Sequence, residues 1–210
     1  MPVVTAQTSG TEGPDPRDTA VPEPAATADK RVWRDRIRSA RRAIPAPQRQ
    51  LSRESNTDHL LTALRGASSV AGYLPLPSEP LDDRLLDQLA ARGVQVIVPI
   101  TEADHPLDWA RYPTVTESGP FGIRTPRGPR LGESAIGTVQ VVLVPAFAVD
   151  RRGVRLGRGG GHYDRSLVLA PTARLIAVLF DDELVDRLPA EPHDLAVHAV
   201  VSPSAGLVEL

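Results

Sequence analysis

The sequence contains no cysteine among its 210 residues, which excludes disulfides, thiolate nucleophiles and cysteine-ligated metal sites. It also lacks any apolar run that approaches the length of a membrane-spanning helix. Its first residues show no basic start followed by an apolar stretch, so we expect no signal peptide. These absences together predict a protein of the cytoplasm that does not enter the membrane.

The sequence also lacks a large excess of positive or negative charge. The 24 lysine and arginine residues are balanced by 26 acidic residues, which gives a net charge of −2. This balance argues against broad electrostatic binding to nucleic acid or to anionic membranes. Lysine itself is scarce: Lys30 is the one lysine of the sequence, and the other basic residues are arginines. A hydrophobic content of 41% is sufficient for a packed core.

Residues 1–28 differ in composition from the rest of the chain. They are rich in Pro, Ala, Thr, Glu and Asp and show no apolar periodicity. Such a segment buries too little apolar surface to offset the entropy of ordering. We therefore expect a disordered, dispensable tail at 1–28 and a single domain at 29–210, with a regulatory tail as the alternative.

The domain is expected to open with a helix. Apolar residues recur at spacings of three and four over residues 33–44, which is typical of one helical face. Asp29 is a suitable N-cap, and Pro45 ends the helix because proline cannot continue it. Lys30 and Arg34 fall on a neighbouring face, one turn apart, so their side chains project together.

Strands and helices alternate along the remaining chain, which predicts an α/β fold. A strand, a helix and a second strand in succession imply parallel pairing, and hence a mostly parallel, Rossmann-like sheet flanked by helices. Ligands of such sheets bind at the carboxyl ends of the strands. The expected elements are a helix over Pro47–Leu64, a strand over Ser69–Leu74, a helix around Leu81–Leu89, strands over Val94–Pro99, Leu107–Tyr112 and Val139–Val144, a helix over Tyr163–Leu169, a strand over Arg174–Phe180, a short helix around Glu183–Leu188 and a strand over Ala196–Val201.

The stretch Arg155–Asp164, which reads RLGRGGGHYD, is the most informative part of the sequence. Glycines let backbone N–H groups approach an anion closely, and Arg158 adds a guanidinium suited to phosphate oxygens. With the apolar strand upstream and a helix downstream, the stretch predicts a phosphate-binding loop; the alternative is a tight surface turn. It matches neither the Walker A loop, nor the dinucleotide fingerprint, nor the kinase glycine loop.

The run from Val144 to Arg165 resembles the signature of the 5-formyltetrahydrofolate cyclo-ligase family, also called 5,10-methenyltetrahydrofolate synthetases. The resemblance covers about residues 29–201. Weaker motifs occur in the family's order: Lys30-x-x-Trp33-Arg34, Leu74-Pro-Leu-Pro-Ser-Glu79, Phe121-Gly122-Ile123 and Leu188-Pro189-x-x-Pro192-His193-Asp194.

The resemblance implies a ligase that uses ATP and Mg²⁺ to close 5-formyltetrahydrofolate to 5,10-methenyltetrahydrofolate, with release of ADP and phosphate. The formyl oxygen would take the γ-phosphoryl group, and the folate N10 would then displace phosphate from the imino-phosphate. We expect a monomer that binds these small molecules and has no nucleic-acid or membrane partner.

Site residues are carried over from the family by their motifs. The resemblance assigns catalysis to Arg158 and Lys30. It assigns ATP binding to Lys30, Arg34, Arg155, Leu156, Gly157, Arg158, Gly159, Gly160, Gly161, His162 and Tyr163. It assigns the folate substrate to Leu74, Glu79, Arg158, Gly159, Gly160, Gly161 and His162, and the metal to Asp164 and Asp194.

Two positions depart from the family pattern. His162 stands where a tyrosine is usual, and His198 stands about where a further acid often follows Asp194. Imidazole titrates near neutrality, so His162 could add a pH dependence. Three alternatives remain open: a non-catalytic folate- or nucleotide-binding protein, an enzyme of another class on a similar scaffold, such as a sugar-phosphate isomerase or CoA-transferase relative, and nucleic-acid binding through the arginine-rich first helix.

Overall fold

The computed structural model describes residues 29–210 apart from 103–104, 120–121 and 192–193. The expected tail at 1–28 lies outside the described residues, as do Phe121, Pro192 and His193 of the family motifs. The first two helices are confirmed: α1 spans Lys30–Ala43 and α2 spans Ala46–Ala63. The Asp29 carboxylate accepts the N–H of Arg31 at 2.9 Å and caps α1 as expected.

Short helices and strands make up the rest of the fold. The remaining α-helices are α3 at Arg84–Ala91 and α4 at His162–Leu167, with 3₁₀ turns at Glu133–Thr138 and Asp181–Glu183. The strands are β1 Ser69–Ala71, β2 Gln95–Ile100, β3 Asp108–Tyr112, β4 Thr116–Ser118, β5 Arg124–Pro126, β6 Val141–Pro145, β7 Ala148–Asp150, β8 Arg155–Leu156, β9 Arg174–Val178, β10 Leu184–Val185, β11 Ala199–Ser202 and β12 Gly206–Glu209. No helix in the described part of the chain has both the length and the hydropathy that a membrane span requires.

The central sheet is mostly parallel, as predicted. Its seven strands lie in the order β12-β11-β9-β6-β1-β2-β3. The five inner strands pair in parallel, whereas β12 and β3 add antiparallel edges. From β1 the chain moves to β2 on one side, and from β6 it moves to β9 on the other. The topological switch point, where α/β sheets bind ligands, therefore lies between β1 and β6.

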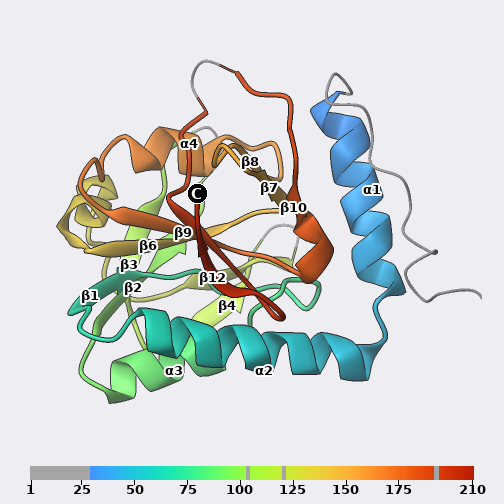
Figure 1. Ribbon diagram of the computed structural model, residues 1–210. Coiled ribbons are helices and arrows are strands. Elements are labelled where there is room, and N and C mark those ends of the chain that lie inside the picture. The colour runs from blue at the N-terminus through green and yellow to red at the C-terminus, as the bar shows by residue number, and fades with distance from the viewer. Residues whose placement is uncertain (1–28, 103–104, 120–121, 192–193) are drawn as a thin grey trace, which may run out of the picture.

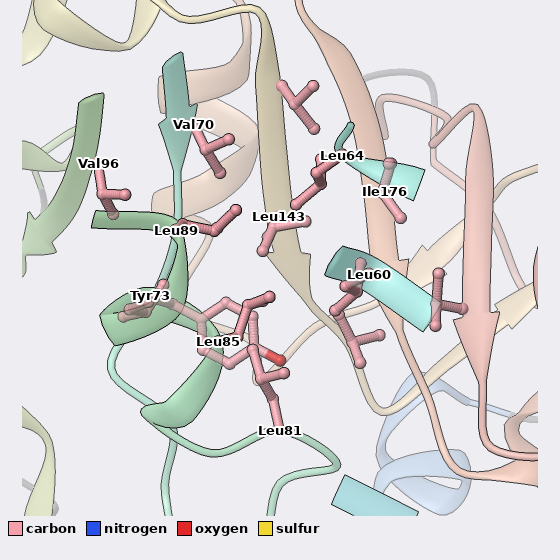
Figure 2. Packing of buried hydrophobic residues seen from close by; sticks show 14 of the residues in the cluster. Leu60, Leu64, Val70, Tyr73, Leu81, Leu85, Leu89, Val96, Leu143 and Ile176 are labelled. Carbon is pink, nitrogen blue, oxygen red and sulfur yellow. The ribbon is translucent and has the colours of Figure 1, made fainter. Parts of the chain in front are cut away.

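Both faces of the sheet are buried, and the strand alternation divides their side chains between two clusters. Leu143 and Ile176 pack with α2 and α3, while Val142 and Val144 point to the opposite cluster, which includes residues of α4. Figure 1 shows α2 and α3 beneath the sheet and α4 above it. Figure 2 shows Leu60 of α2, and Leu64 directly after this helix, beside Leu143 and Ile176.

Helix α1 stands to one side of the central sheet (Figure 1) and packs on a second, small sheet. This sheet has the order β10-β7-β8. Trp33 and Ile37 of α1 are buried against residues that include Phe147 and Leu156. Strand β8 forms the first two residues of the stretch Arg155–Asp164, the glycine stretch, so the packing of α1 also fixes the start of that loop.

Three expectations about the elements were wrong or incomplete. The short helix around Glu183–Leu188 is instead a 3₁₀ turn followed by β10, because Leu184 and Val185 pair in parallel with β7. The strand that leads into the glycines is β8, at the start of the glycine stretch, whereas the expected strand, β6, lies further upstream. The last expected strand is followed by a further strand, β12, which pairs back on β11.

We predict that Trp33→Ala lowers the free energy of unfolding by about 3–5 kcal/mol, since truncating a fully buried tryptophan leaves a cavity. Chemical denaturation followed by circular dichroism measures the change. Val32→Ala is the matched control on the same helix: Val32 is 47% exposed, and its loss should change stability by about 0.5 kcal/mol or less. Equal effects of the two substitutions would contradict the packing of α1 described above.

Candidate active site

A cavity of about 650 Å³ opens at the carboxyl ends of the central strands. Tyr73 and Leu74 follow β1, Pro145 ends β6, and Thr101 follows β2, so the cavity lies at the switch point of the sheet. Every site residue expected from the sequence lines this cavity: Lys30, Arg34, Leu74, Glu79, Arg155, Leu156, Gly157, Arg158, Gly159, Gly160, Gly161, His162, Tyr163, Asp164 and Asp194. The structure thus brings them together, while their individual roles stay predictions.

The glycine stretch runs from β8 into the first turn of α4 and is held by α1. Gly159 has φ +103° and Gly161 has φ +66°, backbone conformations that residues with a side chain rarely adopt. Arg34 donates from Nε to the carbonyl oxygen of Gly157 at 2.8 Å. A Cβ on Gly159 would lie 3.4 Å from the Arg34 guanidinium carbon, an ordinary van der Waals contact, so the positive φ is what favours glycine here.

Arg155 is committed to protein contacts within the cavity wall. Its Nη2 donates to Asp164 Oδ1 at 2.6 Å, and its Nη1 lies 3.4 Å from the carbonyl oxygen of Leu195. The guanidinium therefore connects α4, which carries Asp164, to the segment next to Asp194. Arg155 thereby holds the two predicted metal-binding carboxylates on neighbouring segments.

Lys30 forms an ion pair with Asp194, and both residues line the cavity. Its Nζ lies 2.9 Å from Asp194 Oδ2 and 3.2 Å from Glu191 Oε2. Burial works against the charged amine, but the hydrogen bonds and negative charges of Asp194 and Glu191 outweigh it and raise the pKa of Lys30. Lys30 therefore keeps its positive charge in the cavity that the glycine stretch also lines.

The expected catalytic arginine and the expected folate-binding acid are bonded to each other. Arg158 donates from Nη2 to Glu79 Oε1 at 2.9 Å, while Glu79 Oε2 accepts the N–H of Leu76 at 2.9 Å. The Glu79 side chain is 8% exposed and the Arg158 side chain 42%. The Arg158 guanidinium also lies 5.5 Å from the centre of the Phe147 ring. This pair joins the glycine stretch to the turn that follows β1.

Sequence reasoning missed Arg41, which lines the cavity floor. The Arg41 guanidinium donates to both carboxylate oxygens of buried Glu183, at 2.6 and 2.8 Å, and to the carbonyl oxygen of Ala146 at 2.7 Å. It also lies 5.1 Å from the centre of the Phe147 ring. One signal was available: Arg41 stands four residues after Ile37, in register with the buried face of α1.

Two tyrosines of the cavity carry buried hydroxyl groups. Within the described residues, neither the Tyr73 nor the Tyr163 hydroxyl has a hydrogen-bond partner. Burial raises the pKa of both phenols, and the charge of Glu79 raises the pKa of each further. Tyr163 was expected from the family signature, but Tyr73 was not, because an aromatic residue at a strand end is typical of core packing.

The two histidines that depart from the family pattern have different surroundings. His162 lines the cavity, and its Nδ1 lies 3.1 Å from the carbonyl oxygen of His105. His198 accepts the N–H of Leu175 at 2.9 Å through Nδ1, at the start of β9. The start of a parallel strand is the end of the sheet opposite the cavity. His198 therefore does not extend the acidic pair at Asp164 and Asp194.

Asp164 and Asp194 are suitable for a cation that arrives with a nucleotide. Over the described ranges, no cluster of three or more His, Asp or Glu residues could enclose a metal ion by itself. Mg²⁺ in nucleotide-dependent enzymes usually takes one or two carboxylates and completes its shell with phosphate oxygens and water. Two carboxylates on neighbouring segments of a cavity fit that pattern.

Comparison with known proteins gives consistent results. The model of the 5-formyltetrahydrofolate cyclo-ligase family matches residues 26–203. The 5-formyltetrahydrofolate cyclo-ligase of Mycolicibacterium smegmatis is 43% identical over 177 residues, which cover 81% of this chain and 91% of the relative. That of Escherichia coli K12 is 29% identical over 179 residues, or 80% and 97% of the two chains.

Two solved structures have the same fold. The 5,10-methenyltetrahydrofolate synthetase of Mycoplasma pneumoniae superposes with a TM-score of 0.69 at 18% identity, covering 84% of this chain and all of the other (100%). The NMR structure of the Aquifex aeolicus synthetase gives a TM-score of 0.68 at 25% identity, with coverages of 86% and 92%.

Lys30, as the one lysine of the sequence, allows a direct test of its ion pair. We predict that Asp194→Asn makes Lys30 react severalfold faster with an amine-acylating reagent near pH 9. The asparagine keeps the size of the side chain but removes its charge, so the pKa of Lys30 falls and more of the amine is neutral and nucleophilic. Mass spectrometry measures the rate against a lysine-containing reference peptide. Asp186→Asn, which removes a carboxylate paired with Arg151 instead, should leave the rate unchanged. An unchanged rate in Asp194→Asn would contradict the pairing.

Proposed function

The chain belongs to the 5-formyltetrahydrofolate cyclo-ligase family, and we propose that its cavity performs the ring closure for which the family is named. The reaction converts 5-formyltetrahydrofolate and ATP to 5,10-methenyltetrahydrofolate, ADP and phosphate. The observation that supports this most strongly is the Arg158–Glu79 contact, because it joins the glycine stretch to the acid expected to bind the pterin ring.

The chemistry requires activation of a formamide oxygen, which is a poor leaving group. In the proposed sequence, this oxygen attacks the γ-phosphorus of ATP, and the bond to ADP breaks. The folate N10 then attacks the formyl carbon, the carbon–oxygen bond breaks with release of phosphate, and N10 loses its proton. Every bond that forms or breaks lies within or between the substrates. The protein therefore contributes orientation and charge neutralisation.

Positive charges along one wall of the cavity suit the nucleotide. Lys30 and Arg34 project from the first turns of α1, and Arg34 is already bonded to the glycine stretch. We propose that both bind ATP phosphates, with the backbone and side chains of Arg155–Tyr163. Arg158 is the proposed catalytic residue, since its half-exposed guanidinium can reach a transferring phosphoryl group. Lys30 would assist it there.

Asp164 and Asp194 are the proposed holders of Mg²⁺. When bound, Mg²⁺ neutralises charge on the phosphate oxygens. Both carboxylates are paired with Arg155 and Lys30 in the structure. A cation at these aspartates would compete with Lys30 for Asp194 and leave the amine with the half-exposed Glu191 and the phosphates as partners.

Glu79 is the proposed acceptor for the pterin ring, whose amide and amino N–H groups complement a carboxylate. Leu74, at the same end of β1, provides apolar contact. Glu79 Oε1 is bonded to Arg158, so binding of the pterin would break this ion pair and release Arg158 toward the phosphoryl group. The contact therefore links the two substrates.

We further propose that the protein works in the cytoplasm as a monomer on small-molecule substrates, without nucleic acid. Residues 29–210 are proposed as the catalytic unit, with residues 1–28 dispensable for turnover.

The proposed activity is tested with purified protein, ATP, Mg²⁺ and 5-formyltetrahydrofolate. We expect the absorbance of the methenyl product to rise only when all three are present, with one ADP released per product. Omission of each component provides the control. Folded protein that binds ATP but forms no product would overturn the assignment and favour a non-catalytic binding protein.

We predict that Arg158→Ala lowers kcat at least tenfold, equivalent to about 1.4 kcal/mol of activation free energy, because the transferring charge loses its guanidinium partner. Steady-state kinetics at saturating ATP and folate measure the change. Arg151→Ala is the control: this arginine is exposed and pairs with exposed Asp186, so its loss should leave kcat unaltered. Near-normal turnover of Arg158→Ala would show that Arg158 only ties down the glycine stretch.

A further inference from the structure

Tyr73 presents a polar group that the protein itself does not use. Its side chain is only 4% exposed and lines the cavity, and its hydroxyl has no hydrogen-bond partner within the described residues. The ring packs among the leucines beneath the sheet, with Leu81 and Leu85 nearby (Figure 2). Phenylalanine would satisfy this packing equally well.

An unbonded hydroxyl in the interior reduces stability. Burying a polar group without a partner costs about 1–3 kcal/mol, and most buried polar groups in proteins are therefore bonded. A buried hydroxyl at the wall of a ligand cavity is explained when the ligand supplies the missing partner. The cavity lining around Tyr73 includes Glu79, Arg41 and Tyr163.

The position of Tyr73 in the chain places it on the folate side of the cavity. Tyr73 and Leu74 follow β1 after one glycine, and the same connection continues through the turn to Glu79. The Glu79 N–H closes this turn by donating to the carbonyl oxygen of Leu76 at 2.9 Å. Tyr73 and Glu79 are therefore presented by one short, ordered segment, whereas Tyr163 belongs to the glycine stretch.

We propose that Tyr73 positions the folate substrate by donating a hydrogen bond from its hydroxyl to the ring carbonyl oxygen of the pterin. This inference rests on the proposed function, in which Glu79 accepts the N–H groups of the same ring. In the pterin ring, the nitrogen of the amide N–H and the carbonyl oxygen are attached to the same carbon atom. A carboxylate that accepts the amide N–H therefore leaves the carbonyl oxygen beside it in need of a donor, and a phenol is a donor.

The test is Tyr73→Phe, which removes only the hydroxyl. We expect KM for 5-formyltetrahydrofolate to rise about tenfold, which corresponds to about 1.4 kcal/mol of lost binding. KM for ATP should stay within about twofold, and the thermal unfolding midpoint should not fall, because the hydroxyl has no protein partner to lose. Unchanged KM for the folate in an active enzyme would overturn the proposal, as would an equal loss of affinity for both substrates.

Tyr112→Phe is the matched control. The Tyr112 hydroxyl donates to Asp87 Oδ1 at 2.6 Å, and Tyr112 does not line the cavity. This variant should leave both KM values unchanged and should be the less stable of the two. If it and the unmodified protein both fail to turn over 5-formyltetrahydrofolate, the proposed function fails instead, so the two failures are distinguishable.

A ligand change locates the hydrogen bond on the ring. A competitive inhibitor with the 4-oxo pterin ring is compared with its 4-amino-4-deoxy analogue, in which the acceptor is replaced by an amino group. The analogue also lacks the ring amide N–H that Glu79 accepts, and this loss affects both proteins alike. The unmodified protein should prefer the 4-oxo compound, and Tyr73→Phe should show a smaller preference, because the difference between the two preferences isolates the contribution of the hydroxyl. Equal preferences in the two proteins would overturn the assignment to the carbonyl oxygen.

Discussion

The ion pair between Arg41 and Glu183 holds α1 against the body of the protein, and the site depends on where α1 lies. Both side chains are buried, and the Phe180 N–H donates to Glu183 Oε2 at 2.8 Å in addition to the two bonds from Arg41. Such a pair tolerates little displacement, since separating the partners leaves an uncompensated charge that costs about 3–5 kcal/mol. The ion pair fixes the register in which Lys30 and Arg34 reach the cavity.

The charged groups of the site form ion pairs that each connect two segments of the chain. Lys30 pairs with Asp194, Arg155 with Asp164, and Arg158 with Glu79. On the proposed function, the reactants offer the complementary partners: phosphates for the cations, a metal ion for the aspartates and ring N–H groups for the glutamate. Binding therefore exchanges one set of compensated charges for another, which avoids leaving a buried charge without a partner.

Local patterns in the sequence predicted the elements whose signal is contained within one segment. The periodicity of α1, the parallel β1–α3–β2 unit and the glycine stretch belong to this class. The small sheet was missed because β8 and β10 have two residues each, too few to show alternation, and exist through pairing with β7. Arg41 and Tyr73 were missed for a related reason. A helix arginine usually lies in solvent and a strand-end tyrosine usually packs in the core, and only the tertiary contacts distinguish these two.

The glycine stretch illustrates how far a motif is determined by the protein rather than by its ligand. Gly159 and Gly161 have positive φ angles, and a Cβ on Gly161 would lie 2.8 Å from Arg165 Nη1. A Cβ on Gly160 would lie 2.9 Å from Cδ2 of His162, so the histidine that replaces the usual tyrosine is accommodated by its glycine neighbour. Contacts from α1 and α4 therefore set the conformation of the loop before any anion binds. A loop ordered in this way loses little entropy on binding phosphate, which is the condition for its backbone to act as a preorganised site.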